Sequence, residues 1–233
     1  MPSPPAPANR LTPELVAMTR RAIVDPGPLP GIAGMTESEF DAVAAVALAT
    51  GPQSGDIWIF AYGSLIWKPE FSFEEQRPAI LNGWQRRFAM RIQRFRGTRD
   101  APGLMMVLDR GGFCEGVAQR IARADVGIAL QKLTRREMSS KPPTNRLTWV
   151  EIEVGGETLP ALAITACIDG LNYIGELPMD ETVRVLATAC GHWGSCAEYL
   201  MQTVDSLESL GIHDSYLAEL SERVAERISA SKE

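Results

Sequence analysis

Residues 57–65 read IWIFAYGSL, an apolar run of aromatic and β-branched residues that stops abruptly at a glycine and a serine. Such a run predicts a buried β-strand over 57–62. Gly63 lets the backbone turn with positive φ or approach a ligand closely, and successive N–H groups in such a turn form an anion-binding concavity. Ser64 adds a hydroxyl group. The residues alone leave two interpretations open, a plain turn or a ligand-binding loop at the end of a strand.

Further strands are predicted on the C-terminal side of this stretch. Alternating or short apolar runs place them at 79–95, 104–108, 116–121, 149–154 and 159–167. Glycine-containing segments at 109–112 and 155–158 predict turns between neighbouring strands. The predicted strands therefore all lie between residues 57 and 167.

Helices are predicted from caps and from apolar residues at helical spacing. Capping boxes at Thr36 with Glu39 and at Ser195 with Glu198 open two of them, which end near Gly51 and Gly211. Others run from Asp125 to about Met138, over 180–190 and from Asp214 onward. Strands that come first and helices that come last are typical of an α+β fold. We expect residues 1–55, rich in proline and glycine, to form an N-terminal arm with one or two helices, and residues 56–233 to form one domain.

The composition excludes several classes of function. The chain has 233 residues, and its 23 basic and 29 acidic residues give a net charge of −6, which argues against a dedicated nucleic-acid binder. No apolar run approaches the roughly 18 residues of a membrane span, and the first residues do not resemble a secretory signal. The four cysteines form no CxxC motif, so we expect a reduced, cytoplasmic protein.

Six arginines lie between residues 86 and 99. Such a cluster can bind nucleic acid, but the acidic net charge favours a solvated strand face or ion pairs within the protein for most of them. One or two could hold a substrate carboxylate by bidentate pairing.

Glu137 is the strongest candidate for acid–base chemistry. It follows Leu133 by four residues and Leu130 by seven, so a helix places it on their apolar side. A carboxylate on an apolar face has a raised pKa, which suits a general base near neutral pH. The alternative is a surface glutamate paired with Arg135 or another arginine.

A metal site is not expected. Cys190, His192 and Cys196 lie close together in the sequence, but they number only three and their spacing is irregular. Core cysteines and a loop histidine explain them more simply.

The ordered motifs of the chain resemble those of the ChaC family, the glutathione-specific γ-glutamylcyclotransferases, over about residues 57–220. The similar segments are 57–69, 83–88, 96–98, 102–103, 116–118, the pair Arg136-Glu137, 172–175 and 194–200. The resemblance implies a small, partly closed mixed β-barrel flanked by helices, with Glu137 as the catalytic residue. It also implies a γ-glutamyl pocket formed by Ala61, Tyr62, Gly63, Ser64, Leu65 and Ile66.

Two departures from the family pattern bear on the expected activity. Ala61 stands where the family usually has glycine, and residues 139–145 lack the tyrosine that follows the family's arginine–glutamate pair. The resemblance implies a small-molecule substrate, glutathione or another γ-glutamyl compound, and no cofactor. From the composition and spacing described above, we expect no metal, nucleic-acid or membrane partner. A low-activity, ligand-binding relative stays an alternative.

Overall fold

The computed structural model describes residues 10–231, and the chain divides into two compact units. Unit 1 contains the chain up to Gly27, the segment Arg91–Met105 and the chain from Glu176 onward. Unit 2 contains Pro28–Met90 and Met106–Gly175. Of the predicted N-terminal arm, residues 1–9 lie outside the described residues. The predicted boundary at residue 56 stays a prediction.

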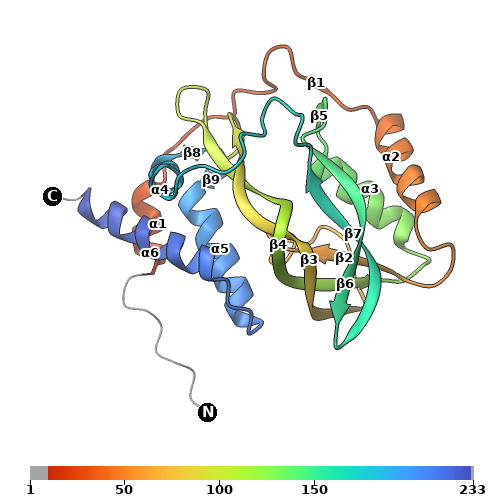
Figure 1. Ribbon diagram of the computed structural model, residues 1–233. Helices are drawn as coiled ribbons and strands as arrows, with labels where there is room; N and C mark the ends of the chain where they lie inside the picture. Colours follow the sequence, from red (N-terminus) through yellow and green to blue (C-terminus); the bar gives the residue numbers. More distant parts are fainter. Residues whose placement is uncertain (1–9, 232–233) are drawn as a thin grey trace. The chain divides into compact units, whose positions relative to one another are not determined.

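Unit 2 is built around a closed five-stranded barrel (Figure 1). Its strands, in barrel order, are β2 (Ile57–Ala61), β4 (Gly103–Ile121), β3 (Glu75–Ile92), β6 (Asn145–Val154) and β7 (Glu157–Ala166). Strand β2 runs parallel to β7 and antiparallel to β4, so the barrel is mixed. The α+β prediction and the barrel implied by the resemblance are confirmed, with a fully closed rather than a partly closed barrel.

Successive residues of each strand point alternately into and out of the barrel, and large apolar side chains are buried on both faces, since the neighbours Ile59 and Phe60 are both fully buried. The largest fully buried ones from its strands are Ile57, Ile59, Phe60, Leu81, Phe88, Leu108, Ile121, Ile152 and Leu162. Burial of each such side chain stabilises the fold by roughly 1.5–3 kcal/mol.

The strand register shows which loops share one end of the barrel. Phe60 pairs with Ala163 on the parallel strand β7, and three residues later Ala166 pairs with Asn145, the first residue of β6. The loop that follows β2 therefore lies at the same end of the barrel as the end of β7 and the start of β6.

Two helices belong to this unit, α2 (Glu37–Thr50) and α3 (Val126–Glu137), and they pack against each other (Figure 1). The predicted capping box is confirmed: Thr36 N donates to Glu39 Oε2 at 2.7 Å and the Thr36 hydroxyl accepts from Glu39 N. Asp125 stands at the N-cap position of α3 as predicted, but its side chain makes no capping hydrogen bond. A two-stranded pair, β1 (Ala33–Gly34) and β5 (Ser140–Lys141), completes the regular structure of unit 2.

The predicted turn at 109–112 is wrong, because β4 runs unbroken through it. Gly111 and Gly112 have φ angles of 116° and 55°, and a Cβ at Gly111 would lie 2.7 Å from the Gln85 side chain. These glycines accommodate a local distortion of one strand rather than a reversal of the chain. The predicted hairpin at 155–158 is confirmed and is tighter than expected, since Val154 already pairs with Glu157.

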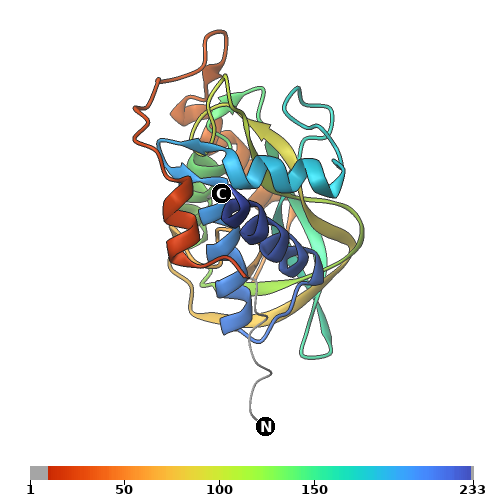
Figure 2. The same ribbon diagram turned by 90° about the vertical axis from the view of Figure 1, so that its left-hand side faces the viewer.

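Unit 1 is mainly helical. It contains α1 (Pro13–Thr19), α4 (Met179–Thr188), β8 (Cys190–Gly191), β9 (Gly194–Ser195), α5 (Cys196–Ser209) and α6 (Ser215–Ala230). Figure 2 shows α1 beside the C-terminal helices, where Val16 is almost fully buried. The Thr19 hydroxyl donates to Ser195 Oγ at 2.7 Å, which ties α1 to the start of α5.

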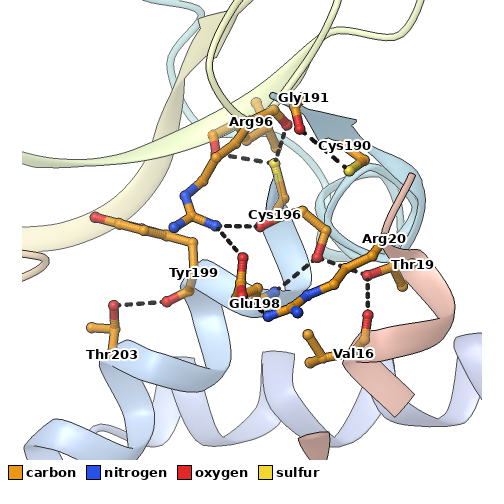
Figure 3. A network of polar contacts seen from close by, with 12 residues as sticks. Val16, Thr19, Arg20, Arg96, Cys190, Gly191, Cys196, Glu198, Tyr199 and Thr203 are labelled. Carbon is orange, nitrogen blue, oxygen red and sulfur yellow. Dashed lines mark hydrogen bonds and ion pairs between the residues drawn. The ribbon is translucent and has the colours of Figure 1, made fainter. Parts of the chain in front are cut away.

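A buried polar network surrounds the start of α5 (Figure 3). Ser195 accepts from Glu198 N, but the Glu198 carboxylate pairs with Arg96 at 3.1 Å and with Arg20 instead of returning to the Ser195 backbone. The predicted second capping box is therefore only half formed. Cys196 is fully buried, which raises the pKa of its thiol to about 11.

Within residues 10–231, no group of three or more His, Cys, Asp or Glu side chains is arranged to hold a metal ion. Helices in this part of the chain are all too short or too polar to cross a lipid bilayer.

Candidate active site

The loop that follows β2, residues 62–68, is a tight turn at one end of the barrel. Ile66 N donates to Gly63 O at 2.9 Å, and Lys68 N donates to Ser64 O at 2.8 Å. The sharp break predicted after the strand is confirmed, because β2 ends at Ala61. We call residues 62–68 the β2 loop.

Two buried side chains from the barrel wall hold carbonyl groups of this loop. Arg86 of β3 donates from Nη1 to Tyr62 O at 2.7 Å, and Gln119 of β4 donates from Nε2 to Leu65 O at 3.2 Å. Arg86 is 4% exposed and Gln119 is 0% exposed. The backbone of the loop is therefore fixed by buried side chains of two barrel strands, whose donors are shielded from water and make strong hydrogen bonds.

The backbone N–H groups of the loop differ from its carbonyl groups in their hydrogen-bond partners. Within the described chain, the N–H groups of Gly63, Ser64 and Leu65 donate to no protein acceptor, whereas the N–H of Ile66 is used inside the turn. Three consecutive amides without a protein acceptor can bind an anion or a developing oxyanion. Of the six predicted substrate-binding residues, these three carry the backbone donors that such binding needs.

Glu137 is the last residue of α3 and lies on the side of the helix that the spacing predicts. Leu130 and Leu133 on that side are buried, and the Glu137 side chain is 19% exposed. Burial raises the pKa of the Glu137 carboxyl above its ordinary value, the Arg136 guanidinium beside it offsets part of this rise, and Glu70 adds to it. The carboxyl is thus partly buried and also paired with an arginine, so each of the two interpretations that the sequence left open holds in part.

The partner of Glu137 is Arg136 rather than Arg135. Arg136 Nε lies 2.9 Å from Glu137 Oε1, whereas Arg135 pairs with Glu37 of α2. Arg136 also donates from Nη2 to Ser64 Oγ at 2.7 Å and from Nη1 to Lys68 O. One guanidinium therefore joins the candidate base to the β2 loop.

The end of α3 has a second anchor at this end of the barrel. Asn145, the first residue of β6, donates from Nδ2 to the carbonyl oxygen of Glu137 at 3.1 Å. The strand register places Asn145 at the same barrel end as the β2 loop, so the two halves of the candidate site are joined by the barrel as well as by Arg136.

Sequence reasoning missed the roles of Arg136 and Gln119. The Arg136-Glu137 pair was visible as a motif, but the sequence does not show that the arginine reaches a loop 68 residues earlier. Arg86 lies in the arginine cluster that the sequence singled out. Other members of that cluster pair with acids of the protein, as the favoured interpretation predicts: Arg87 lies 3.9 Å from Asp109, Arg94 binds Asp25 and Arg96 binds Glu198.

Comparisons with known proteins agree with this architecture. The family model described as ChaC-like protein matches residues 57–227. The chain is 33% identical over 177 residues to the glutathione-specific γ-glutamylcyclotransferase of Escherichia coli (strain K12), covering 76% of each chain. It is 32% identical over 174 residues to the human glutathione-specific γ-glutamylcyclotransferase 1, covering 72% of this chain and 78% of the relative.

A solved structure shares the fold. The crystal structure of a yeast γ-glutamyl cyclotransferase specific to glutathione superposes with a TM-score of 0.66 at 25% identity, covering 74% of this chain and 97% of the yeast chain. Since the family model spans well over half of the sequence and the relatives match along most of their own length, the chain belongs to the ChaC-like protein family.

Proposed function

We propose that this protein is a γ-glutamylcyclotransferase that cleaves glutathione to 5-oxoproline and Cys-Gly, with Glu137 as the general base. The observation that carries the proposal is the link, through one arginine, between a partly buried carboxyl of raised pKa and a loop in which three consecutive amides have no acceptor among residues 10–231. The choice of glutathione as substrate rests on relatives that are named glutathione-specific γ-glutamylcyclotransferases.

The reaction is an aminolysis within one substrate molecule. The α-amine of the γ-glutamyl group attacks its own γ-carbonyl carbon, a new C–N bond closes the five-membered ring, and the bond from that carbon to the cysteine nitrogen breaks. The products contain all atoms of glutathione, and no oxidation or added water is involved. Since nucleophile and electrophile belong to the same molecule, the protein has to fold the substrate into a reactive shape, and orientation of this kind lowers the barrier by several kcal/mol.

Glu137 handles the proton in this scheme. The α-amine arrives as an ammonium ion, and Glu137 removes a proton so that the lone pair can attack. The attacking nitrogen loses a second proton as the ring closes. The carboxyl returns its proton to the departing cysteine nitrogen, and that amine also takes up the second proton and leaves as an ammonium ion. A raised pKa suits both steps, because it strengthens the base and still permits release of the proton.

The β2 loop binds the substrate in this scheme. The N–H groups of Gly63, Ser64 and Leu65 hold the α-carboxylate or stabilise the oxygen of the γ-carbonyl as negative charge develops on it. Ala61, Tyr62 and Ile66 complete the substrate-binding set, and Ile66 contributes its side chain because its N–H is used in the turn.

Two alternatives use the same loop and carboxyl. The enzyme could act on another γ-glutamyl amine or peptide. Alternatively, the absence of a tyrosine from residues 139–145 favours a protein that binds the ligand with little turnover.

One set of incubations separates these functions. The purified protein is incubated with glutathione or with γ-glutamyl dipeptides, 5-oxoproline is quantified by mass spectrometry, and glutathione binding is measured by calorimetry. We expect equimolar 5-oxoproline and Cys-Gly from glutathione. Product from the dipeptides alone would redirect the substrate assignment, binding without product would indicate a ligand-binding relative, and neither binding nor product would refute the proposal.

A further inference from the structure

We propose that Arg136 is a positioning residue that fixes the β2 loop and the Glu137 carboxylate relative to each other. The role of this juxtaposition in turnover rests on the proposed function, but the juxtaposition itself can be tested without substrate. Arg136 is assigned no contact with the reacting atoms, and it acts through Glu137, Ser64 and Lys68.

The contacts of Arg136 use every nitrogen of its guanidinium. Nε faces Glu137 Oε1 at 2.9 Å, Nη2 donates to Ser64 Oγ at 2.7 Å, and Nη1 donates to Lys68 O. The guanidinium is planar and rigid, so three acceptors that bind one such group are held in a fixed arrangement. The Arg136 side chain is 14% exposed and its hydrogen bond to Ser64 is partly buried, which shields that bond from competing water, whereas the hydrogen bond to Lys68 O is exposed.

The contact with Ser64 also orients a hydroxyl group. Because the arginine donates to Ser64 Oγ, that oxygen acts as an acceptor there, and its own hydrogen points elsewhere. Within the part of the chain that the structure describes, the Ser64 hydroxyl donates to no protein group. Arg136 thus leaves the Ser64 O–H as a donor beside the three amides of the loop.

The contact with Glu137 sets the charge of the carboxyl. Burial and the like charge of Glu70 raise the pKa of Glu137, while the charge and hydrogen bond of Arg136 lower it. Lys68 Nζ lies 3.9 Å from Glu70 Oε1. Without Arg136, the Glu137 carboxyl would hold its proton to a higher pH and fewer molecules would carry an ionised base.

Two substitutions and a neighbouring control separate these effects. Arg136→Met removes the charge and all three contacts, whereas Arg136→Lys keeps the charge and loses the planar fork. Arg135→Met is the control, because Arg135 precedes Arg136 in the same helix, is 40% exposed and pairs with Glu37 away from the loop. Circular dichroism and thermal unfolding establish that each variant is folded.

The first readout is the pKa of Glu137 in the substrate-free protein. It is measured by NMR with ¹³C-carboxyl-labelled glutamate, and the Glu137 signal is assigned by its absence from Glu137→Gln. We expect Arg136→Met to raise this pKa, Arg136→Lys to raise it less, and Arg135→Met to leave it unchanged. Amide signals of Gly63, Ser64 and Leu65 are expected to shift in both Arg136 variants and to stay in place in the control.

The second readout is turnover of glutathione. We expect the acidic limb of kcat/KM to move to higher pH in Arg136→Met, and KM to rise roughly tenfold or more in both Arg136 variants because charge-assisted hydrogen bonds to the loop are lost. If Arg136→Lys has the acidic limb of the wild type but keeps a raised KM, the positive charge sets the pH dependence and the planar guanidinium sets substrate affinity.

The outcomes distinguish this inference from the proposed function. An unchanged Glu137 pKa together with unchanged loop signals in Arg136→Met would overturn the inference, whether or not the wild-type protein is active. A wild-type protein that forms no 5-oxoproline, but whose pKa and loop signals respond to Arg136→Met, would support the juxtaposition and refute the activity. If Arg136→Met fails to fold, the Glu137 pKa and the loop amide signals of Arg136→Lys test the inference instead. Loop signals identical to those of the wild type would contradict the need for a planar guanidinium.

Discussion

Removal of the Glu198 carboxylate is expected to destabilise the protein strongly. Glu198 pairs with two arginines that differ in environment (Figure 3): the Arg96 side chain is 11% exposed and the Arg20 side chain is 61% exposed. Glu198→Gln keeps the size and shape of the side chain and removes its charge. Arg96 then keeps its hydrogen bond to Ser195 O, at 2.8 Å, but its buried positive charge loses the carboxylate that neutralises it.

The magnitude follows from burial. Loss of one partner from a buried ion pair costs roughly 3–5 kcal/mol, because the other charge stays buried without compensation. In a protein of about this size, each kcal/mol lowers Tm by about 2–4 °C, so the expected loss is on the order of 6–20 °C. Arg20→Met removes the exposed partner of the same carboxylate and is expected to cost about 1 kcal/mol or less.

The assay is chemical denaturation of the wild type, Glu198→Gln and Arg20→Met at neutral pH, with thermal unfolding as a second measure. We expect the Glu198 variant to lose several times more unfolding free energy than the Arg20 variant. Equal and small losses in both would show that the Arg96–Glu198 pair contributes little, and would refute the reasoning from burial.

Other substitutions test the barrel end and the candidate base. Glu137→Gln should be more stable than wild type above the raised pKa of Glu137, because the folded wild-type protein binds the Glu137 proton more tightly than the unfolded chain does. This difference in unfolding free energy should vanish as the pH falls below the ordinary glutamate range. Urea titrations at several pH values measure the difference, and a difference that does not change with pH would contradict the prediction. Gly116→Ala would place a Cβ 2.5 Å from Ala61 O and is expected to cost about 1–3 kcal/mol and to lower turnover. A Cβ at Gly127 in α3 would have no atom within 4 Å, so Gly127→Ala is expected to stabilise the protein by about 0.5–1 kcal/mol. Similar effects of Gly116→Ala and Gly127→Ala would argue against the clash at Gly116.

Features that depend on neighbours in the sequence were predictable. The Thr36–Glu39 capping box lies within one helical turn, and the strand at residues 57–61 consists of apolar residues that suit a buried strand. The position of Glu137 on the apolar side of its helix follows from its spacing to Leu130 and Leu133. In each case a local pattern and the tertiary structure favour the same conformation.

Features that depend on distant partners were not predictable. Ser195 and Glu198 have capping-box spacing, but a buried arginine 102 residues earlier in the chain binds the glutamate more strongly than a backbone amide would. Gly111 and Gly112 suggest a turn, yet the pairing of β4 in the barrel keeps the strand continuous. The reach of Arg136 to the β2 loop likewise depends on the closed barrel.

The role of Glu137 is tested most directly by the rate at which Glu137→Gln forms 5-oxoproline from glutathione, measured beside the affinity of the same variant for glutathione. The amide keeps the shape of the side chain but cannot accept the proton. We predict a rate lower by about 10²–10⁴-fold with binding largely retained. Wild-type turnover by this variant would contradict the assignment of Glu137 as the base.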